Sequence, residues 1–194
     1  MKAVLASGNA GKVREFAALL AARDIEVIAQ SDFGIVTPAE TGTTFLENAL
    51  LKARHAASLC ALPALADDSG IEVDALGGRP GVWSARYAGE HASDADNVDL
   101  LLRELSGVPT AQRGARYRCV LVFMRAAADP DPLVTQGVWT GRVLTAARGS
   151  GGFGYDSIFQ PDGYEVSAAQ LPAAQKNVIS HRAQALRALL AALT

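Results

Sequence analysis

The sequence contains few cysteines, few lysines and no long apolar run, and these shortages exclude several classes of protein. Cys60 and Cys119 are its only cysteines, and they lack the spacing of a zinc site and the density of a disulfide framework. The longest apolar run, 186–193, is interrupted by Arg187 and falls short of the roughly 20 residues of a membrane span. We therefore expect buried, reduced cysteines and no membrane-spanning segment.

The sequence also has no strong excess of positive or of negative charge, since the net charge is -2 and the isoelectric point is about 5.9. No basic field is available to hold long nucleic acid, so an anionic ligand needs a local group of cations. No signal-peptide stretch opens the sequence, because Ser7, Asn9 and Lys12 interrupt it, so we expect a cytoplasmic protein. Apolar residues make up 49% of the chain, enough for a core in one domain or in two lobes.

Lysine is scarce because arginine supplies 14 of the 18 cations. Lysine has a compact ammonium, whereas arginine has a planar fork, so the retained lysines can mark sites that need a point charge. Three of the four, Lys12, Lys52 and Lys176, lie in the motifs described below.

Apolar periodicity predicts a mixed α/β protein. We expect strands at 2–6, 25–29, 64–66, 71–75, 117–124 and 157–160, and a strand pair at 133–144 interrupted by Gly137 and Gly141. We expect helices through 13–20, 44–60, 94–105 and 180–193.

The first motif is a small polar loop that leaves the first expected strand and opens a helix. It consists of Ser7, Gly8, Asn9, Ala10, Gly11 and Lys12. Backbone N–H groups at a helix N-terminus, small residues and one ammonium suit a phosphate group. The Walker A pattern does not fit, because its first glycine falls on Ala6 and its hydroxyl residue on Val13. An ordinary strand-to-helix turn is the alternative.

The second motif belongs to the next expected helix. Thr44 and Glu47 have the spacing of a capping box. Asn48 and Lys52 are four residues apart on one helix face, so one can position a ligand while the other meets its charge. Glu40 precedes the helix and can reach the same ligand. A solvated helix face is the alternative.

The third motif is Asp67-Asp68-Ser69-Gly70, which follows an apolar strand. Adjacent carboxylates in such a place are costly to desolvate unless they meet cations or hydrogen-bond donors. They would typically supply a magnesium ligand and a water-activating base, with Gly70 turning the backbone close to the ligand. A plain polar turn between two strands is the alternative.

The fourth motif is the glycine-rich segment 149–156. It contains the letters of a dinucleotide-binding pattern, but a strand and Pro161 follow where that pattern requires a helix. Phe153 and Tyr155 suit a flat base instead, because stacking on an aromatic ring is worth about 1–3 kcal/mol. A hairpin turn with core aromatics is the alternative.

The fifth motif is Lys176 followed by Ser180-His181-Arg182 at the start of the last helix. Ser180 is a good N-cap, which is the plain interpretation of the triplet. Three donors close to a helix N-terminus also suit a carbonyl-bearing base or a phosphate.

Taken together, these motifs resemble the inosine triphosphatase, or Ham1-like, family of non-canonical purine nucleoside triphosphate pyrophosphatases. The matching segments keep the family order through nearly the whole chain, which is more specific than any single motif. They are 5–12, 40–42, 45–49, 52–53, 66–70, 77–81, 84–87, 151–156 and 180–182.

The resemblance implies a two-lobed mixed α/β domain over residues 1–194, with a long curved central sheet, a nucleotide cleft between the lobes, and a homodimer. It implies Mg²⁺ held by Glu40 and Asp68, with Asp68 also the catalytic base. The other implied substrate contacts are Ser7, Gly8, Asn9, Ala10, Gly11, Lys12, Lys52, Ser69, Phe153, Gly154, Tyr155, Asp156, Lys176, His181 and Arg182. The family pattern is not kept at Ser157, Gln170, Ala174 and Gln175, on the base side.

The implied reaction converts ITP, dITP or XTP to the monophosphate and pyrophosphate. Donors from His181 or Arg182 match the 6-oxo group of these bases, whereas the amino group of adenine leaves both sides unpaired, so we expect ATP to be rejected. This reasoning does not exclude GTP. The alternatives are a related pyrophosphatase for pyrimidine triphosphates and a catalytically silent nucleotide-binding module.

Overall fold

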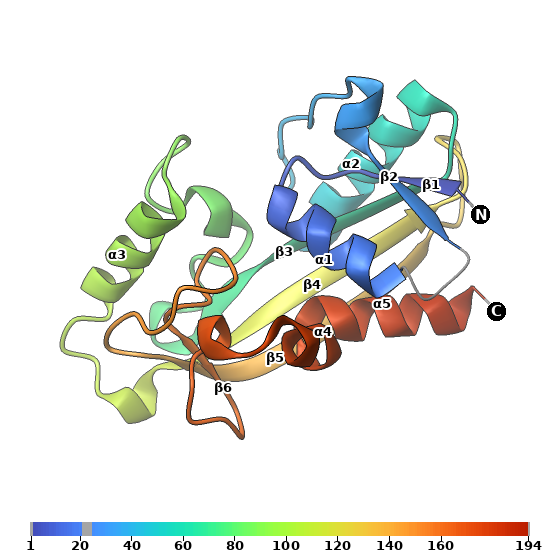
Figure 1. Cartoon of the computed structure of the whole chain (residues 1–194). Coiled ribbons are helices and arrows are strands. Elements are labelled where there is room, and N and C mark those ends of the chain that lie inside the picture. The colour runs from blue at the N-terminus through green and yellow to red at the C-terminus, as the bar shows by residue number, and fades with distance from the viewer. Residues whose placement is uncertain (1, 21–24, 194) are drawn as a thin grey trace. The chain divides into compact units, whose positions relative to one another are not determined.

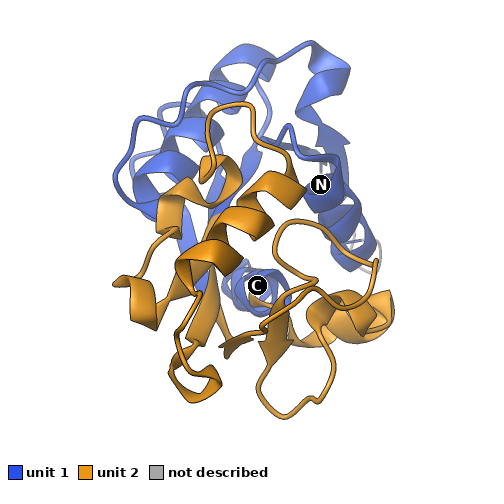
Figure 2. Ribbon diagram, turned by 90° about the vertical axis from the view of Figure 1, so that its left-hand side faces the viewer, with its two compact units in different colours: residues 1–68, 119–137, 182–194 blue, residues 69–118, 138–181 orange. Residues whose placement is uncertain are grey.

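The computed structural model describes residues 2–20 and 25–193. The chain divides into two compact units (Figure 2). Unit 1 comprises residues 1–68, 119–137 and 182–194, and unit 2 comprises residues 69–118 and 138–181. The single domain with a nucleotide cleft between lobes stays a prediction.

The fold is mixed α/β, as the sequence predicts, with a six-stranded sheet in the order β2-β1-β3-β4-β5-β6. The strands are β1 (Lys2–Leu5), β2 (Glu26–Ala29), β3 (Ala64–Val73), β4 (Gly114–Met124), β5 (Leu133–Val143) and β6 (Phe159–Pro161). The helices are α1 (Ala10–Leu20), α2 (Phe45–Cys60), α3 (Asp94–Glu104), α4 (Ala173–Ile179) and α5 (His181–Ala192).

Three neighbouring strands, β2, β1 and β3, run parallel, so the segments that follow them lie at the same edge of the sheet. β1 pairs in parallel with β2 on one side and with β3 on the other (Figure 1). Parallel crossovers are right-handed, so α1, which joins β1 to β2, and α2, which precedes β3, cover opposite faces of these strands. In α/β sheets ligands bind beside the carboxyl ends of the strands where the strand order reverses, which here is the end of β1.

Each unit has its own apolar core. In unit 1, α1 and α5 pack with β1, β3 and β4 through buried side chains that include Phe16, Leu186, Leu5, Leu65 and Leu121. In unit 2, α3 packs with strand residues through Leu101, Leu105, Ile71, Trp139 and Phe159. Packing in these cores holds the nearby strand ends in place, so the polar side chains that follow them have fixed positions.

The segment at 64–75 differs from the prediction of two short strands around a polar turn, because β3 runs unbroken from Ala64 to Val73 and a 3-10 helix, Asp74–Leu76, follows it. Asp67 and Asp68 are only 1% and 5% exposed, and each meets a cation that offsets its desolvation. Gly70 does not form a turn. A Cβ there would overlap the carbonyl oxygen of Gly81 and lie 2.5 Å from Ser84 Oγ, so glycine serves close packing.

The structure differs from the prediction at two places in the second half of the chain: the strand pair predicted at 133–144 was wrong, and one helix was missed. β5 continues through Gly137 and Gly141, and a Cβ at Gly141 would overlap the carbonyl oxygen of Gln160, so glycine allows β6 to pair there. Helix α4 was not predicted. Lys176 is its one buried side chain, so no apolar periodicity marks this helix.

The structure also describes the two cysteines and the length and polarity of the helices. Cys60 and Cys119 are free thiols, with Cys119 buried and Cys60 half-buried. Within residues 2–20 and 25–193, every helix is too short or too polar to cross a bilayer.

Candidate active site

The predicted phosphate loop follows directly on the end of β1. Ser7 Oγ accepts a hydrogen bond from the N–H of Asn9 at 3.2 Å, and Asn9 Oδ1 accepts one from the N–H of Lys12 at 3.1 Å. An asparagine in this position caps a helix, and the first N–H groups of the helix have no carbonyl partner within it. The positive end of α1 therefore lies at the carboxyl end of β1, where an anion is stabilised.

A pocket of about 450 Å³ opens on this loop in unit 1. Its walls are the loop and α1 on one side and the segment after β2 on the other: Ser7, Gly8, Ala10, Val13, Arg14, Ala29, Gln30, Ser31, Ile35 and Thr37. A Cβ on Gly8 would lie 2.9 Å from Thr37 Oγ1, which accepts a hydrogen bond of 2.6 Å from Gln30 Nε2. Gly8 thus lets the loop approach this wall. The wall formed by the segment after β2 was not identified from the sequence, because its residues form no recognisable motif.

The paired carboxylates of β3 lie just beyond the last residues that pair with β1. Leu65 is opposite Leu5, the last residue of β1, so Asp67 and Asp68 come next to the phosphate loop. Successive side chains of a strand point to opposite faces. Asp67 accordingly meets Lys12 of α1, and Asp68 meets Lys52 of α2.

Asp67 is buried between two cations. Its Oδ2 lies 3.0 Å from Lys12 Nζ and 3.5 Å from Arg182 Nε. Arg182 also binds Glu15 of α1, with Nη1 2.8 Å from Oε2. Burial alone would raise the pKa of Asp67, but Lys12, Arg182 and Lys52 together hold it well below its usual value. Asp67 is therefore ionised in the folded protein at neutral pH, and it holds the ammonium of Lys12 in place.

Asp68 lies in a second cluster, centred on the ammonium of Lys52. Lys52 Nζ lies 2.8 Å from Asp68 Oδ1 and 2.7 Å from Glu40 Oε1. Asn48 Nδ2 donates a hydrogen bond to Asp68 Oδ2 at 3.2 Å. Burial raises the pKa of Asp68, Lys52 and Lys12 oppose that shift, and Glu40 adds to it, with a raised pKa as the result. A carboxylate with a raised pKa suits a general base near neutral pH.

Helix α2 brings Asn48 and Lys52 to this cluster, as their spacing predicts. The predicted capping box is present: Thr44 accepts from the N–H of Glu47 at 3.1 Å, and Glu47 accepts from the N–H of Thr44 at 3.0 Å. Burial would lower the pKa of Lys52, but Asp68, Asp67 and Glu40 raise it, so the ammonium keeps its charge.

The donor set of this cluster fits Mg²⁺. Mg²⁺ prefers hard oxygen ligands and is usually bound by one or two carboxylates together with water and substrate phosphates. Glu40 and Asp68 supply two carboxylates that Lys52 already draws together. In the described part of the chain, no group of three or more His, Cys, Asp or Glu side chains is placed to hold a metal. The remaining ligands would have to be phosphate and water oxygens.

The predicted base-side residues form a separate group in unit 2. Lys176 Nζ lies 2.6 Å from Asp156 Oδ2 and 4.9 Å from the centre of the Phe153 ring. Asp156 Oδ2 also accepts a hydrogen bond of 2.9 Å from the N–H of Phe153. One carboxylate thus fixes both the backbone and the ammonium, and the ammonium contacts the ring as a cation–π pair.

His181 and Tyr155 are buried more deeply than their predicted roles suggest. The His181 ring stacks on Tyr117, with centroids 4.7 Å apart and planes 4° apart. Tyr155 is 3% exposed, belongs to the core of unit 2 and donates a hydrogen bond of 2.8 Å to the carbonyl oxygen of Ser84. Gly154 donates its N–H to Asp94 Oδ2 at 2.6 Å, a contact that no motif indicated.

The remaining predicted positions are placed as follows. Ser69 is half-buried in β3, directly after Asp68. Gln170, where the family pattern is not kept, accepts a hydrogen bond of 3.0 Å from the N–H of Ser167 and so completes a capping box. The contacts of all these residues with a substrate stay predictions.

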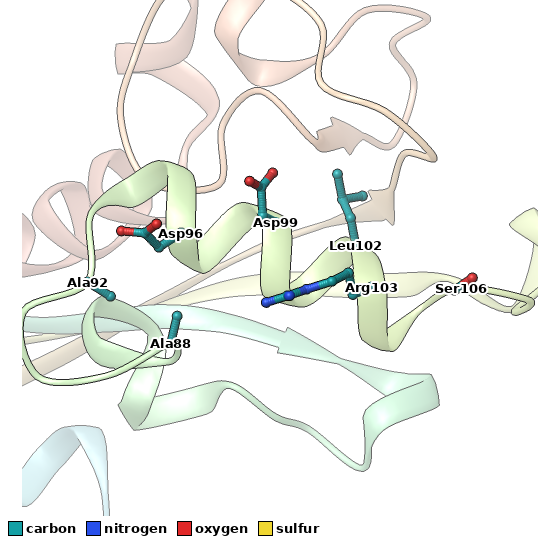
Figure 3. A pocket seen from close by; sticks show the side chains of 7 residues that line it. All are labelled: Ala88, Ala92, Asp96, Asp99, Leu102, Arg103 and Ser106. Carbon is teal, nitrogen blue, oxygen red and sulfur yellow. The ribbon is translucent and has the colours of Figure 1, made fainter.

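A cavity of about 930 Å³ lies along α3 in unit 2 (Figure 3). Its lining residues are Ala88, Ala92, Asp96, Asp99, Leu102, Arg103 and Ser106, none of which was predicted to be in the site. Asp96 Oδ2 accepts a hydrogen bond of 2.8 Å from the N–H of Ser93, as a helix cap. Its charged lining residues are two carboxylates and one guanidinium, so the lining carries a net negative charge, which does not suit a polyphosphate.

Residues 3–192 match the Ham1 family. The dITP/XTP pyrophosphatase of Vibrio cholerae is 55% identical over 192 residues, which cover 99% of this chain and 96% of that protein. The dITP/XTP pyrophosphatase of Vibrio parahaemolyticus is 56% identical over 193 residues, covering 100% and 96%. The structure of a Ham1 protein from Coxiella burnetii matches with a TM-score of 0.91 and 45% identity, covering 100% of this chain and 98% of that one.

Proposed function

This chain belongs to the Ham1 family, and on that premise we propose that it hydrolyses non-canonical purine nucleoside triphosphates such as ITP, dITP and XTP. The products are the monophosphate and pyrophosphate. This reaction removes such nucleotides from the nucleotide pool.

The observation that carries the proposal is the cluster around Lys52. Its ammonium joins Glu40 and Asp68 at 2.7 and 2.8 Å, next to the loop that opens α1. Carboxylates for a divalent ion, a buried general base and a phosphate-binding loop are the parts that hydrolysis of a phosphoanhydride requires.

Two lysines hold the phosphates in the proposed reaction. Lys12 and Lys52 are held in place by carboxylates, so little reorganisation is needed when a triphosphate arrives. Asp68 orients a water molecule for in-line attack on the α-phosphorus and accepts its proton. The bond from that phosphorus to the bridging oxygen breaks, and pyrophosphate leaves.

Glu40 and Asp68 are the residues that would hold Mg²⁺, and both present carboxylate oxygens. When bound, the ion would neutralise charge on the phosphates and polarise their oxygens.

The base contacts are proposed for unit 2. Phe153 offers a ring face to a flat purine, and Lys176 and His181 bring donors that match a 6-oxo group. Arg182 was predicted to contact the base, but its guanidinium binds Asp67 and Glu15 in unit 1. We propose that the first role of Arg182 is to hold Asp67, which in turn holds Lys12 in place.

A substrate panel tests the proposal. Pyrophosphate release is measured with ITP, dITP, XTP, GTP, ATP, dUTP, UTP and dTTP, each with Mg²⁺ and with excess chelator. We expect turnover of ITP, dITP and XTP that the chelator abolishes, and little turnover of ATP. Preference for the pyrimidine triphosphates, or binding without turnover, would contradict the proposal.

We further propose that the protein is cytoplasmic and acts as a homodimer, as the family resemblance implies. Light scattering tests the second statement, because a solution mass equal to the chain mass of 20.2 kDa would contradict it. Fractionation of cells tests the first.

A further inference from the structure

Arg14 lines the 450 Å³ pocket together with Ser7, Gly8 and Ala10 of the phosphate loop. Ala10 and Arg14 are four residues apart in α1, so their side chains share a face of the helix. Helical side chains lean toward the N-terminus, so the guanidinium of Arg14 can reach back toward the first turn. The first N–H groups of a helix, which suit phosphate, are found in that turn.

The guanidinium of Arg14 is available for a ligand. The side chain is exposed, and no hydrogen bond or ion pair engages it among residues 2–20 and 25–193. Arg182, by contrast, is 5% exposed and is bound to carboxylates. A free guanidinium in a pocket presents a planar fork of donors that suits phosphate oxygens.

The other cations at this end of β1 are already matched by carboxylates. With every group ionised, the set carries one net negative charge, since three cations meet four carboxylates: Lys12, Lys52 and Arg182 with Glu15, Glu40, Asp67 and Asp68. A nucleoside triphosphate adds about four negative charges at neutral pH. One divalent ion cancels about two of these negative charges, so about three remain together with the charge of the set itself, and a further cation within reach is needed.

Lys12 and Arg14 approach the helix N-terminus from different sides. They are two residues apart in α1, so they do not share a helix face. Lys12 is held 3.0 Å from Asp67, next to Asp68, which orients the water that attacks the α-phosphorus in the proposed reaction. We propose that Arg14 is a further substrate-binding residue, whose guanidinium contacts the β- and γ-phosphates that leave as pyrophosphate. This role depends on the proposed function and deepens it.

The test compares R14Q with R54Q. Arg54 is also exposed and in unit 1, but it lies on α2 outside the pocket and donates to the carbonyl oxygen of Ala127 at 3.3 Å. We expect R14Q to raise the KM for ITP and the inhibition constant of pyrophosphate about 10-fold, because a charged hydrogen bond is lost, and to change kcat less than about 3-fold. Inhibition by IMP should not change. R14K should recover part of the loss, and R54Q should match the wild type.

Equal KM values for R14Q and R54Q, or equal weakening of IMP and pyrophosphate inhibition, would overturn the assignment. Failure of the proposed function has a different signature, since the wild type would then release no pyrophosphate from any triphosphate. Calorimetry with pyrophosphate and Mg²⁺ needs no turnover and still tests Arg14. Binding to R14Q must be about 10-fold weaker than binding to the wild type, or the assignment is wrong.

Discussion

Asp67 and Asp68 are neighbours in one strand, yet their surroundings give them opposite properties. Asp67 faces Lys12 and Arg182, which lower its pKa despite complete burial. Asp68 faces the side of α2, where burial and the carboxylate of Glu40 raise its pKa against the effect of Lys52. The alternation of side chains along β3 therefore separates an anion that fixes a lysine from a carboxylate that can exchange a proton.

Replacing the proposed base tests this distinction at the residue scale. D68N keeps the shape of the side chain but cannot accept a proton, so we expect kcat for ITP to fall by at least about 100-fold. The circular dichroism spectrum should stay that of the wild type. D32N, which changes an exposed carboxylate of unit 1, is the matched control and should keep full activity. Unchanged pyrophosphate release by D68N would refute the role of Asp68.

At the scale of elements, α2 supplies two side chains of the cluster around Asp68. Asn48 and Lys52 project from one of its faces to Asp68, and buried alanines at 49, 53 and 56 let the helix lie close to its neighbours. The capping box at Thr44 fixes where the helix begins, so it also fixes the register of Asn48 and Lys52.

Removal of the cap should weaken the protein without altering the chemistry. We expect T44A to lower the free energy of unfolding by about 1 kcal/mol, because the N–H of Glu47 loses its acceptor. Urea unfolding measures the loss. S58A removes an exposed hydroxyl from the same helix and should stay within about 0.5 kcal/mol of the wild type. A T44A protein as stable as the wild type would show that the cap contributes nothing.

At the scale of the whole molecule, the buried ion pairs make stability depend on pH. The folded-state pKa of Asp67 lies below the value in the unfolded chain, which is about 3.9. The paired carboxylate therefore adds stability above about pH 4, and that stability is lost as the pH falls from there toward the folded-state pKa.

The difference between the wild type and D67N in urea unfolding measures this contribution. At pH 7 we expect D67N to be less stable by about 3 kcal/mol, because Lys12 and Arg182 are left without their buried partner. Below pH 4 the difference should shrink by about 1.4 kcal/mol per pH unit, because the carboxyl of Asp67 takes up a proton in the unfolded wild-type chain while it stays ionised in the folded one. A difference that stays constant from pH 7 to pH 3 would contradict the assignment.

The sequence by itself determined the elements with a clear local signal, and with them the motifs of the site. The 3.6-residue period and the capping box predicted α2, and a run of β-branched and aromatic residues predicted most of β4, because both signals lie in neighbouring residues. Helix α4 and the unbroken β3 were missed, since burial of Lys176 and of Asp67 depends on partners far along the chain. Which carboxylate holds Lys12, where Arg182 binds and which residues wall the pocket beside Gly8 were decided only by the tertiary structure. Such contacts depend on strand order and strand register, and residues distant in sequence carry no local record of either.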